Sequence, residues 1–331
     1  MKRRDFLPRR QFLHLAAGAA IFTAIVALAN DAAWPQAGRI IRIVVPFPAG
    51  GSATVLARLL GDQISKAQGP TVIIENRPGA GAAIAYEAVA RAAPDGNTLV
   101  INGNSLVINP HLKKVSYDPL TSFEPICYLL SSPQLIVVNS ASAYRTLGDL
   151  VAAARAKPGE LSFAGVGPGA TQHIGIELFK RVADVDLVYV PYSGGGPAIN
   201  DLLGGHVTAV LGNYSEVVEL LNSGKLRALA ATSKKRIEPL PDLPTVAEQG
   251  YKDYEVEVWF GVLAPAKTPK QSAAELATWF TAAMQAPDVK AKLVNLGLYP
   301  VGICGDDFAA HIRKQGEEYG HIIEEANIKA E

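Results

Sequence analysis

The chain has 331 residues, of which 49% are hydrophobic and 19% are charged, so it can bury a large core and is expected to be globular. Its 31 basic and 31 acidic residues give a formal net charge of zero. This balance argues against a nucleic-acid partner and against a basic membrane-binding face.

Residues 1–29 have the layout of a signal peptide, with a basic start, an apolar run and small residues at the end. The pattern predicts cleavage after Ala29. The pair Arg9-Arg10 fits the twin-arginine type of export signal. A retained anchor helix is the alternative, but the apolar run is short for a membrane span and His14 interrupts it. We therefore expect a protein exported to the periplasm, with its signal peptide removed.

From residue 40 onward, short apolar runs alternate with helical patterns. Strands are expected over 40–46, 71–75, 97–102, 161–165, 186–192, 207–212 and 225–232. Helices are expected over 54–67, 80–92, 150–156, 170–182, 197–205 and 215–224. The strands are uniformly apolar, which is typical of parallel sheets covered by helices on both faces. Thr146 and Asp149 form a capping box before one helix, and Pro197 is expected to open another.

Two longer extended runs, 124–138 and 255–265, lie between these groups of elements. After the second run come two helical patterns, a short strand over 297–301 and a closing helix over 306–326. A carboxy-terminal portion of this size is too small to fold alone, so we expect it to return to the first group. The prediction is an α/β protein of two lobes, 38–131 plus 258–331 and 132–257, joined by two crossing strands.

Three glycine-rich turns precede helices, at 47–54, 164–171 and 191–198. In parallel sheets such turns gather beyond the carboxyl ends of the strands, where ligands bind. The first N–H groups of a helix have no internal partner and attract anions. These stretches contain no Lys or Arg, so a bound anion would be held by amides and hydroxyls. Four or five such bonds of ~1.5–3 kcal/mol each could approach the ~8 kcal/mol of micromolar binding. The alternative to a ligand site is that these turns only connect strands to helices, as in many α/β proteins.

No arrangement of residues indicates catalysis or a cofactor. Ser52 follows Gly51 without completing a nucleophile elbow, and the GVGPGA segment lacks the last glycine of a dinucleotide motif. No His or Cys spacing resembles a metal site. We therefore expect neither cofactor nor metal, although an α/β enzyme acting on a carboxylic acid in the same cleft stays open as the alternative. Cys127 and Cys304 are far apart in sequence, and two free thiols or one disulfide both fit an exported protein.

Segments along the whole mature chain resemble one known family. They include VPFPAGG, ENRPGAGAAIAYEAVARAAPDGNTLV, YDPLTSF, AKPGELSFAG, VPYSGGGPAINDLLGGHV, GKLRALAATSKKR, LPTVAEQGY and WFGVLAPA. In this order they are similar to the Bug-type, or TctC, solute-binding proteins. The resemblance implies a monomeric, two-lobed periplasmic binding protein of the type II architecture that closes on a small carboxylate. Some members of this family serve a tripartite tricarboxylate transporter, and others feed sensors or have no known partner.

By this resemblance, one ligand carboxylate is held between the lobes by backbone amides and ordered water. The implied ligand-binding residues are Phe47, Ala49, Gly50, Gly51, Ser52, Asn104, Ser105, Gly165, Gly167, Ala170, Thr171, Tyr192, Ser193 and Asn213. Turn chemistry or core packing is an equally good reading of the polar and aromatic ones.

The chain departs from the family pattern at three positions that bear on the ligand. Many relatives have Asp at the position of Thr54, Lys at that of Ser193 and Asp at that of Thr208. The missing carboxylate at Thr54 removes a partner for a ligand ammonium, and the missing lysine at Ser193 removes a partner for a second anionic group. These two losses predict a ligand less charged than citrate or glutamate, such as a monocarboxylate or an aromatic acid.

Overall fold

The computed structural model describes residues 38–329, so the predicted signal peptide lies outside the described residues. The chain divides into two units, Met1–Gly38 and Arg39–Glu331, and all elements named below belong to the second. Within the described part, no helix is both long and apolar enough to cross a membrane.

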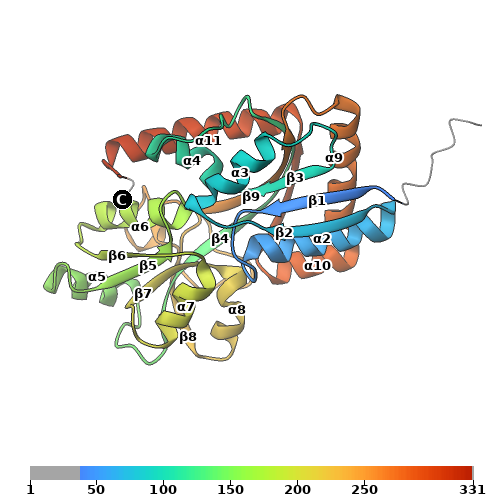
Figure 1. Cartoon of the computed structure of the whole chain (residues 1–331). Helices are drawn as coiled ribbons and strands as arrows, with labels where there is room; N and C mark the ends of the chain where they lie inside the picture. Colours follow the sequence, from blue (N-terminus) through green and yellow to red (C-terminus); the bar gives the residue numbers. More distant parts are fainter. Residues whose placement is uncertain (1–37, 330–331) are drawn as a thin grey trace, which may run out of the picture. The chain divides into compact units, whose positions relative to one another are not determined.

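Strands and helices alternate along the chain, much as the sequence predicts (Figure 1). The strands are β1 (Ile40–Val45), β2 (Thr71–Asn76), β3 (Thr98–Asn102), β4 (Phe123–Asn139), β5 (Ser162–Val166), β6 (Val188–Tyr192), β7 (Ala209–Asn213), β8 (Leu226–Ala231), β9 (Glu257–Pro265) and β10 (Tyr299–Cys304). The helices are α2 (Ser52–Gln68), α3 (Ala83–Ala90), α4 (Ser105–Leu112), α5 (Leu147–Ala156), α6 (Thr171–Ala183), α7 (Gly195–Leu203), α8 (Tyr214–Asn222), α9 (Lys270–Gln285), α10 (Pro287–Asn295) and α11 (Asp306–Glu325), with short 3₁₀ turns η2 (Ala80–Ala82) and η3 (Ala247–Gln249).

The outer strands of both lobes pair in parallel, as uniformly apolar strands predict. In the first lobe β1 lies between β2 and β3, and in the second lobe β5 lies between β6 and β7. The inner pairs are antiparallel, because β9 and β4 run against their neighbours. Strand β4 belongs to both lobes, since Phe123–Pro133 pairs with β9 and Gln134–Asn139 pairs with β7 and β8.

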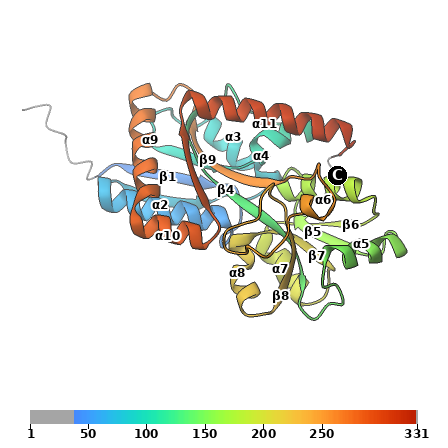
Figure 2. The ribbon, with the colours of Figure 1, turned by 180° about the vertical axis from the view of Figure 1, so that it is seen from behind.

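The carboxy-terminal elements return to the first lobe. In Figure 2, α9 and α10 lie beside β1 and α2, and α11 runs along the top of the molecule over α3 and α4. Leu276 and Phe280 of α9 share a buried core with Ile41 and Ile43 of β1. The α/β fold with two lobes is therefore confirmed, while the lobe bounds 38–131 plus 258–331 and 132–257 stay a prediction.

Several local predictions need adjustment. Helix α7 begins at Gly195, so Pro197 is its third residue and does not open it as expected. Helix α4 directly after β3 was not predicted, because its apolar residues surround Pro110 and show no clear period. The capping box of α5 is confirmed: Thr146 Oγ1 accepts from the Asp149 N–H at 3.1 Å, and the Asp149 carboxylate accepts from the Thr146 N–H at 2.9 Å.

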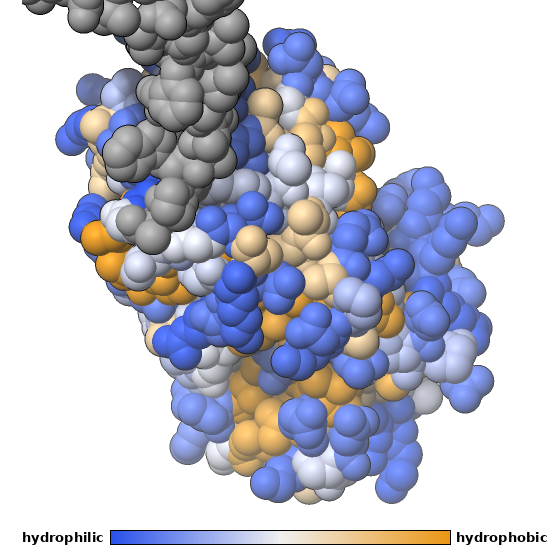
Figure 3. Space-filling view, turned by 90° about the vertical axis from the view of Figure 1, so that its right-hand side faces the viewer, coloured by the Kyte–Doolittle hydropathy of each residue, from blue (hydrophilic) through white to orange (hydrophobic). Residues whose placement is uncertain are grey.

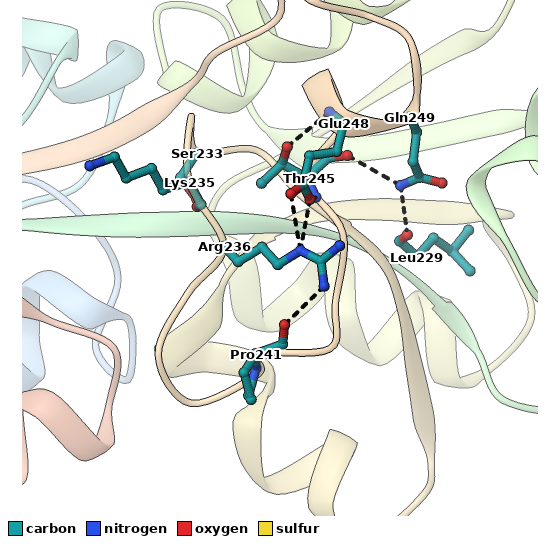
Figure 4. Close-up of polar contacts among 8 residues, drawn as sticks. All are labelled: Leu229, Ser233, Lys235, Arg236, Pro241, Thr245, Glu248 and Gln249. Atoms are coloured by element: carbon teal, nitrogen blue, oxygen red, sulfur yellow. Dashed lines mark hydrogen bonds and ion pairs between the residues drawn. The ribbon is translucent and has the colours of Figure 1, made fainter.

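The stretches SKKR and LPTVAEQGY form a polar network that fixes the chain after β8 (Figure 4). The Arg236 Nε donates to both carboxylate oxygens of Glu248, at 3.1 and 2.9 Å. Glu248 also accepts from the Thr245 N–H at 2.8 Å, and its own N–H donates to Thr245 Oγ1. The backbone bond from Thr245, followed by Arg236, holds the pKa of Glu248 below its ordinary value. These motif residues thus stabilise the fold and do not line the cavity described below.

Hydrophilic residues cover much of the face seen in Figure 3, with hydrophobic residues in patches between them. Mixed surfaces of this kind are usual for monomeric proteins. The monomeric state stays a prediction.

Candidate functional site

The three glycine-rich turns meet at one cavity between the lobes, with a volume of about 160 Å³. The turn after β1 comes from the first lobe, and the turns after β5 and β6 come from the second. The predicted residues that line this cavity are Phe47, Ala49, Gly50, Gly51, Ser52, Asn104, Ser105, Ala170, Thr171 and Asn213. The sequence argument did not predict Val258 and Phe260 of β9, which form an apolar part of the lining.

The remaining predicted residues lie elsewhere. Gly167, Tyr192 and Ser193 line a second hollow next to the first, which shares Phe47 and Ser105 with it. Gly165 lines neither hollow, because it lies against α6, where a Cβ would approach Gln172 Cβ at 2.9 Å. Gly165 is therefore a packing glycine.

Three helices begin at the cavity without a side-chain cap. The N-cap residues Gly51 of α2, Ala170 of α6 and Gly194 of α7 make no side-chain hydrogen bond to the helix. The first N–H groups of each helix have no partner within the helix and carry partial positive charge. Glycine at two of these caps also lets the backbone approach a ligand closely. The cavity therefore offers several main-chain donors to one anion.

The lining contains no Lys, Arg or His among the described residues. An anion bound here would be stabilised by N–H groups, hydroxyls and amide side chains. In the same part of the chain, no three His, Cys, Asp or Glu residues are grouped so that they could hold a metal ion.

Ser52 lines the cavity and forms hydrogen bonds between the two lobes. Its Oγ lies 2.6 Å from Ser215 Oγ and accepts from Asn213 Nδ2 at 3.2 Å. Asn213 is held in turn by Gln134 of β4, whose Nε2 donates to Asn213 Oδ1 at 3.2 Å. The N-terminus of α2 in the first lobe is thereby fixed against the start of α8 in the second.

Asn104 and Thr54 form hydrogen bonds that hold together the elements around the cavity. The Asn104 amide donates to Glu257 O at 3.0 Å and to Tyr319 Oη at 2.6 Å, and its Oδ1 accepts from the Trp259 N–H at 3.1 Å. Its polar groups therefore join α4 to β9 and α11. Thr54 does not line either hollow; its Oγ1 accepts from Asn76 Nδ2 at 2.8 Å and so steadies the first glycine turn.

Tyr192 and Thr208 also have partners within the second lobe. The Tyr192 hydroxyl donates to the Asp201 carboxylate of α7, and this bond raises the pKa of Tyr192 to about 12. Thr208 Oγ1 accepts from the Ser162 N–H at 3.2 Å at the start of β5. Thr54 and Thr208 therefore do not line the cavity. Of the three positions that depart from the family pattern, Ser193 is exposed and lines the second hollow beside the cavity.

Glu216 is the functional candidate that sequence reasoning missed. It lies in the first turn of α8 and is the sole ionisable side chain among the described lining residues. Burial raises the pKa of its carboxyl above the ordinary value, and hydrogen bonds from Ser52 and Asn213 partly offset that rise. In sequence, Asn213 followed three residues later by Glu216 has the spacing of a helix-capping pair. This spacing gives no sign that the Glu216 carboxyl contacts Ser52 of the other lobe.

Comparison of the chain with known proteins identifies one family. Residues 56–328 match the TctC model, described as the tripartite tricarboxylate transporter family receptor. Protein BugT of Bordetella pertussis is 34% identical over 294 residues, covering 88% of this chain and 90% of BugT.

Solved structures agree with the sequence matches. Rpa4515 of R. palustris, determined with adipate, is 34% identical with a TM-score of 0.85 and covers 90% of this chain and 99% of that chain. MatC from Rhodopseudomonas palustris, determined with bound malate, is 28% identical with a TM-score of 0.80 and covers 86% and 99%. These are substrate-binding proteins, so the enzyme alternative is set aside. The chain belongs to the TctC, or Bug, family of periplasmic solute-binding proteins.

Proposed function

We propose that the protein captures a small carboxylate in the cavity between its lobes. The observation that carries this proposal is the convergence of the N-termini of α2, α6 and α7, none capped by the side chain of its own N-cap residue, on a cavity whose described lining has no cationic side chain. Relatives determined with adipate and with malate support a carboxylate as the ligand class. Because Glu216 adds a carboxyl to the same cavity, we favour a ligand with fewer charges than citrate.

Ligand binding would draw the lobes together, since each lobe supplies part of the donor set. The crossing strand β4 and the segment entering β9 are the connections that would flex. A ligand that contacts both lobes stabilises the closed form by its extra contacts there.

We expect carboxylates to raise the melting temperature of the protein lacking residues 1–29. A panel of acetate, benzoate, malate, adipate and citrate would be screened by thermal shift, with affinities measured by calorimetry. At a ligand concentration of ~100 Kd the stabilisation is about 2.7 kcal/mol, or about 4 °C for a chain of this size. Adipamide is the matched control, because it keeps the length of adipate and lacks its charge. Equal binding of adipamide and adipate, or no shift with any acid, would contradict the proposal.

We further propose that the periplasmic protein delivers its ligand to the membrane subunits of a tripartite tricarboxylate transporter. The family description supports this partner. Cells lacking the protein are expected to lose uptake of the radiolabelled acid that binds best in vitro, and a plasmid copy should restore it. Unchanged uptake in the deletion strain, with the membrane subunits present, would favour a sensor as the partner instead.

A further inference from the structure

The carboxyl of Glu216 lies inside the proposed ligand cavity with one oxygen lacking any partner. Oε1 accepts from the Ser52 N–H at 3.4 Å and from Ser52 Oγ at 3.3 Å. Oε2 is fully enclosed and makes no hydrogen bond of normal geometry with a described residue, although Asn213 lies close enough to the carboxyl to lower its pKa. It lies against the backbone of Gly195, where any Cβ would overlap it. The carboxyl of one lobe thus sits between the N-termini of α2 and α7, where an external anion would also be attracted.

Among the residues that the structure describes, no positive side chain lies against this carboxyl. The residues that face it are Ser52 from α2, Gly195 from α7, and Asn213 and Ser215 beside it on β7 and α8. None of these side chains is charged. An ionised Oε2 without a donor is unfavourable in an enclosed position, and the pKa of Glu216 is raised accordingly.

A ligand carboxylate in the same cavity makes the ionised form still less favourable. Two carboxylates that share a site without a counter-cation do not both remain charged, and one of them takes up a proton. The ligand carboxylate is free in solution and ionised at neutral pH, whereas Glu216 is already raised in pKa by its surroundings. The proton therefore goes to Glu216.

We propose that Glu216 is a neutral carboxylic acid in the ligand complex, so that the site binds a carboxylate together with one proton from solvent. This inference rests on the proposed carboxylate function and adds a selection rule to it. The cavity takes a ligand that carries a carboxylate and has no cationic group to pair with Glu216. Affinity accordingly falls as the pH rises above the pKa of Glu216.

Calorimetry on the strongest binder of the acid panel tests the proposal. Titrations from about pH 6 to about pH 8.5, in buffers that differ in ionisation enthalpy, give the number of protons taken up with the ligand. We expect uptake to approach one proton at the upper end, with affinity decreasing about tenfold per pH unit there. For Glu216→Gln we expect no proton uptake, an affinity constant within about twofold across the range, and tighter binding than wild type at high pH.

Glu219→Gln is the matched control, because it removes a charge from the exposed face of the same helix and lies outside the cavity lining. It should keep the proton uptake and pH dependence of the wild type. Wild-type binding without proton uptake, or an E216Q variant that loses affinity at all pH values, would overturn the coupling of ligand binding to proton uptake at Glu216 while leaving carboxylate binding intact. Absence of binding by every acid would instead overturn the proposed function itself.

A stability measurement checks Glu216 without any ligand. A carboxyl whose pKa is raised in the folded state contributes stability below its unfolded pKa, and this contribution is lost as the pH rises through the folded pKa. The melting temperature of E216Q relative to wild type should therefore increase from acidic to alkaline pH. A constant difference would show that the folded protein does not raise the pKa of Glu216 and would overturn the proposal.

Discussion

Replacing Gly81 with alanine is expected to weaken carboxylate binding about 10- to 100-fold, or ~1.4–2.8 kcal/mol. Gly81 lies in η2 of the first lobe, and a Cβ there would overlap the backbone carbonyl oxygen of Pro168 in the second lobe. Backbone atoms cannot rotate away as a flexible side chain can, so the lobes must separate slightly to admit the methyl group. The closed arrangement, in which both lobes contact the ligand, then becomes less favourable.

The Gly81 backbone has φ of 56°, in the left-handed region, so alanine also introduces local strain of ~1–2 kcal/mol. Gly224→Ala separates the two effects. Gly224 has φ of 69° in an exposed turn before β8, and a Cβ there would meet nothing within 4 Å. Both variants should lose similar stability in chemical denaturation, and only Gly81→Ala should lose affinity in calorimetry. Equal affinities for the two variants would show that this contact between lobes does not limit binding.

The convergence of the glycine turns could be predicted because it depends on local rules. Strands β1, β5 and β6 are each followed by a glycine-rich turn and a helix, and parallel strands place such turns at one edge of their sheet. The antiparallel entry of β9 between β3 and β4 could not be predicted, since it depends on pairing between distant segments. Val258 and Phe260 were missed for that reason.

Residue roles within the cavity were harder to predict than its location. Asn104 follows a strand end as a ligand-binding residue would, yet its amide bonds to β9 and α11, which lie more than 150 positions away in sequence. Glu216 shows the opposite case, because a helix-capping pattern concealed a carboxyl that reaches Ser52 in the other lobe. Both assignments depend on contacts between segments far apart in the sequence, within the first lobe for Asn104 and between the lobes for Glu216, which no short sequence pattern encodes.

The pairing of the two cysteines also depends on tertiary structure. Cys127 of β4 and Cys304 of β10 are ladder partners and form a disulfide across 177 positions, which resolves the alternative that the sequence left open. Spacing of this length carries no information about pairing. The cross-link attaches β10 and the elements around it to the core of the first lobe.

Reduction of this disulfide is expected to lower the free energy of unfolding by about 5 kcal/mol. The bond joins cysteines separated by 177 positions, and the chain-entropy model assigns ~5 kcal/mol to a loop of this length because the cross-link restricts the unfolded chain. Denaturation of the oxidised protein and of the same protein under reductant measures the difference without a change of sequence.

The cavity supplies the control for this experiment. Neither cysteine lines it, so the reduced protein should bind the best acid of the panel with nearly unchanged affinity under native conditions. Coincident denaturation curves would contradict the stabilisation that the chain-entropy model assigns to this disulfide. A loss of affinity would mean that the position of β10 affects the shape of the cavity through β4, the strand shared by both lobes.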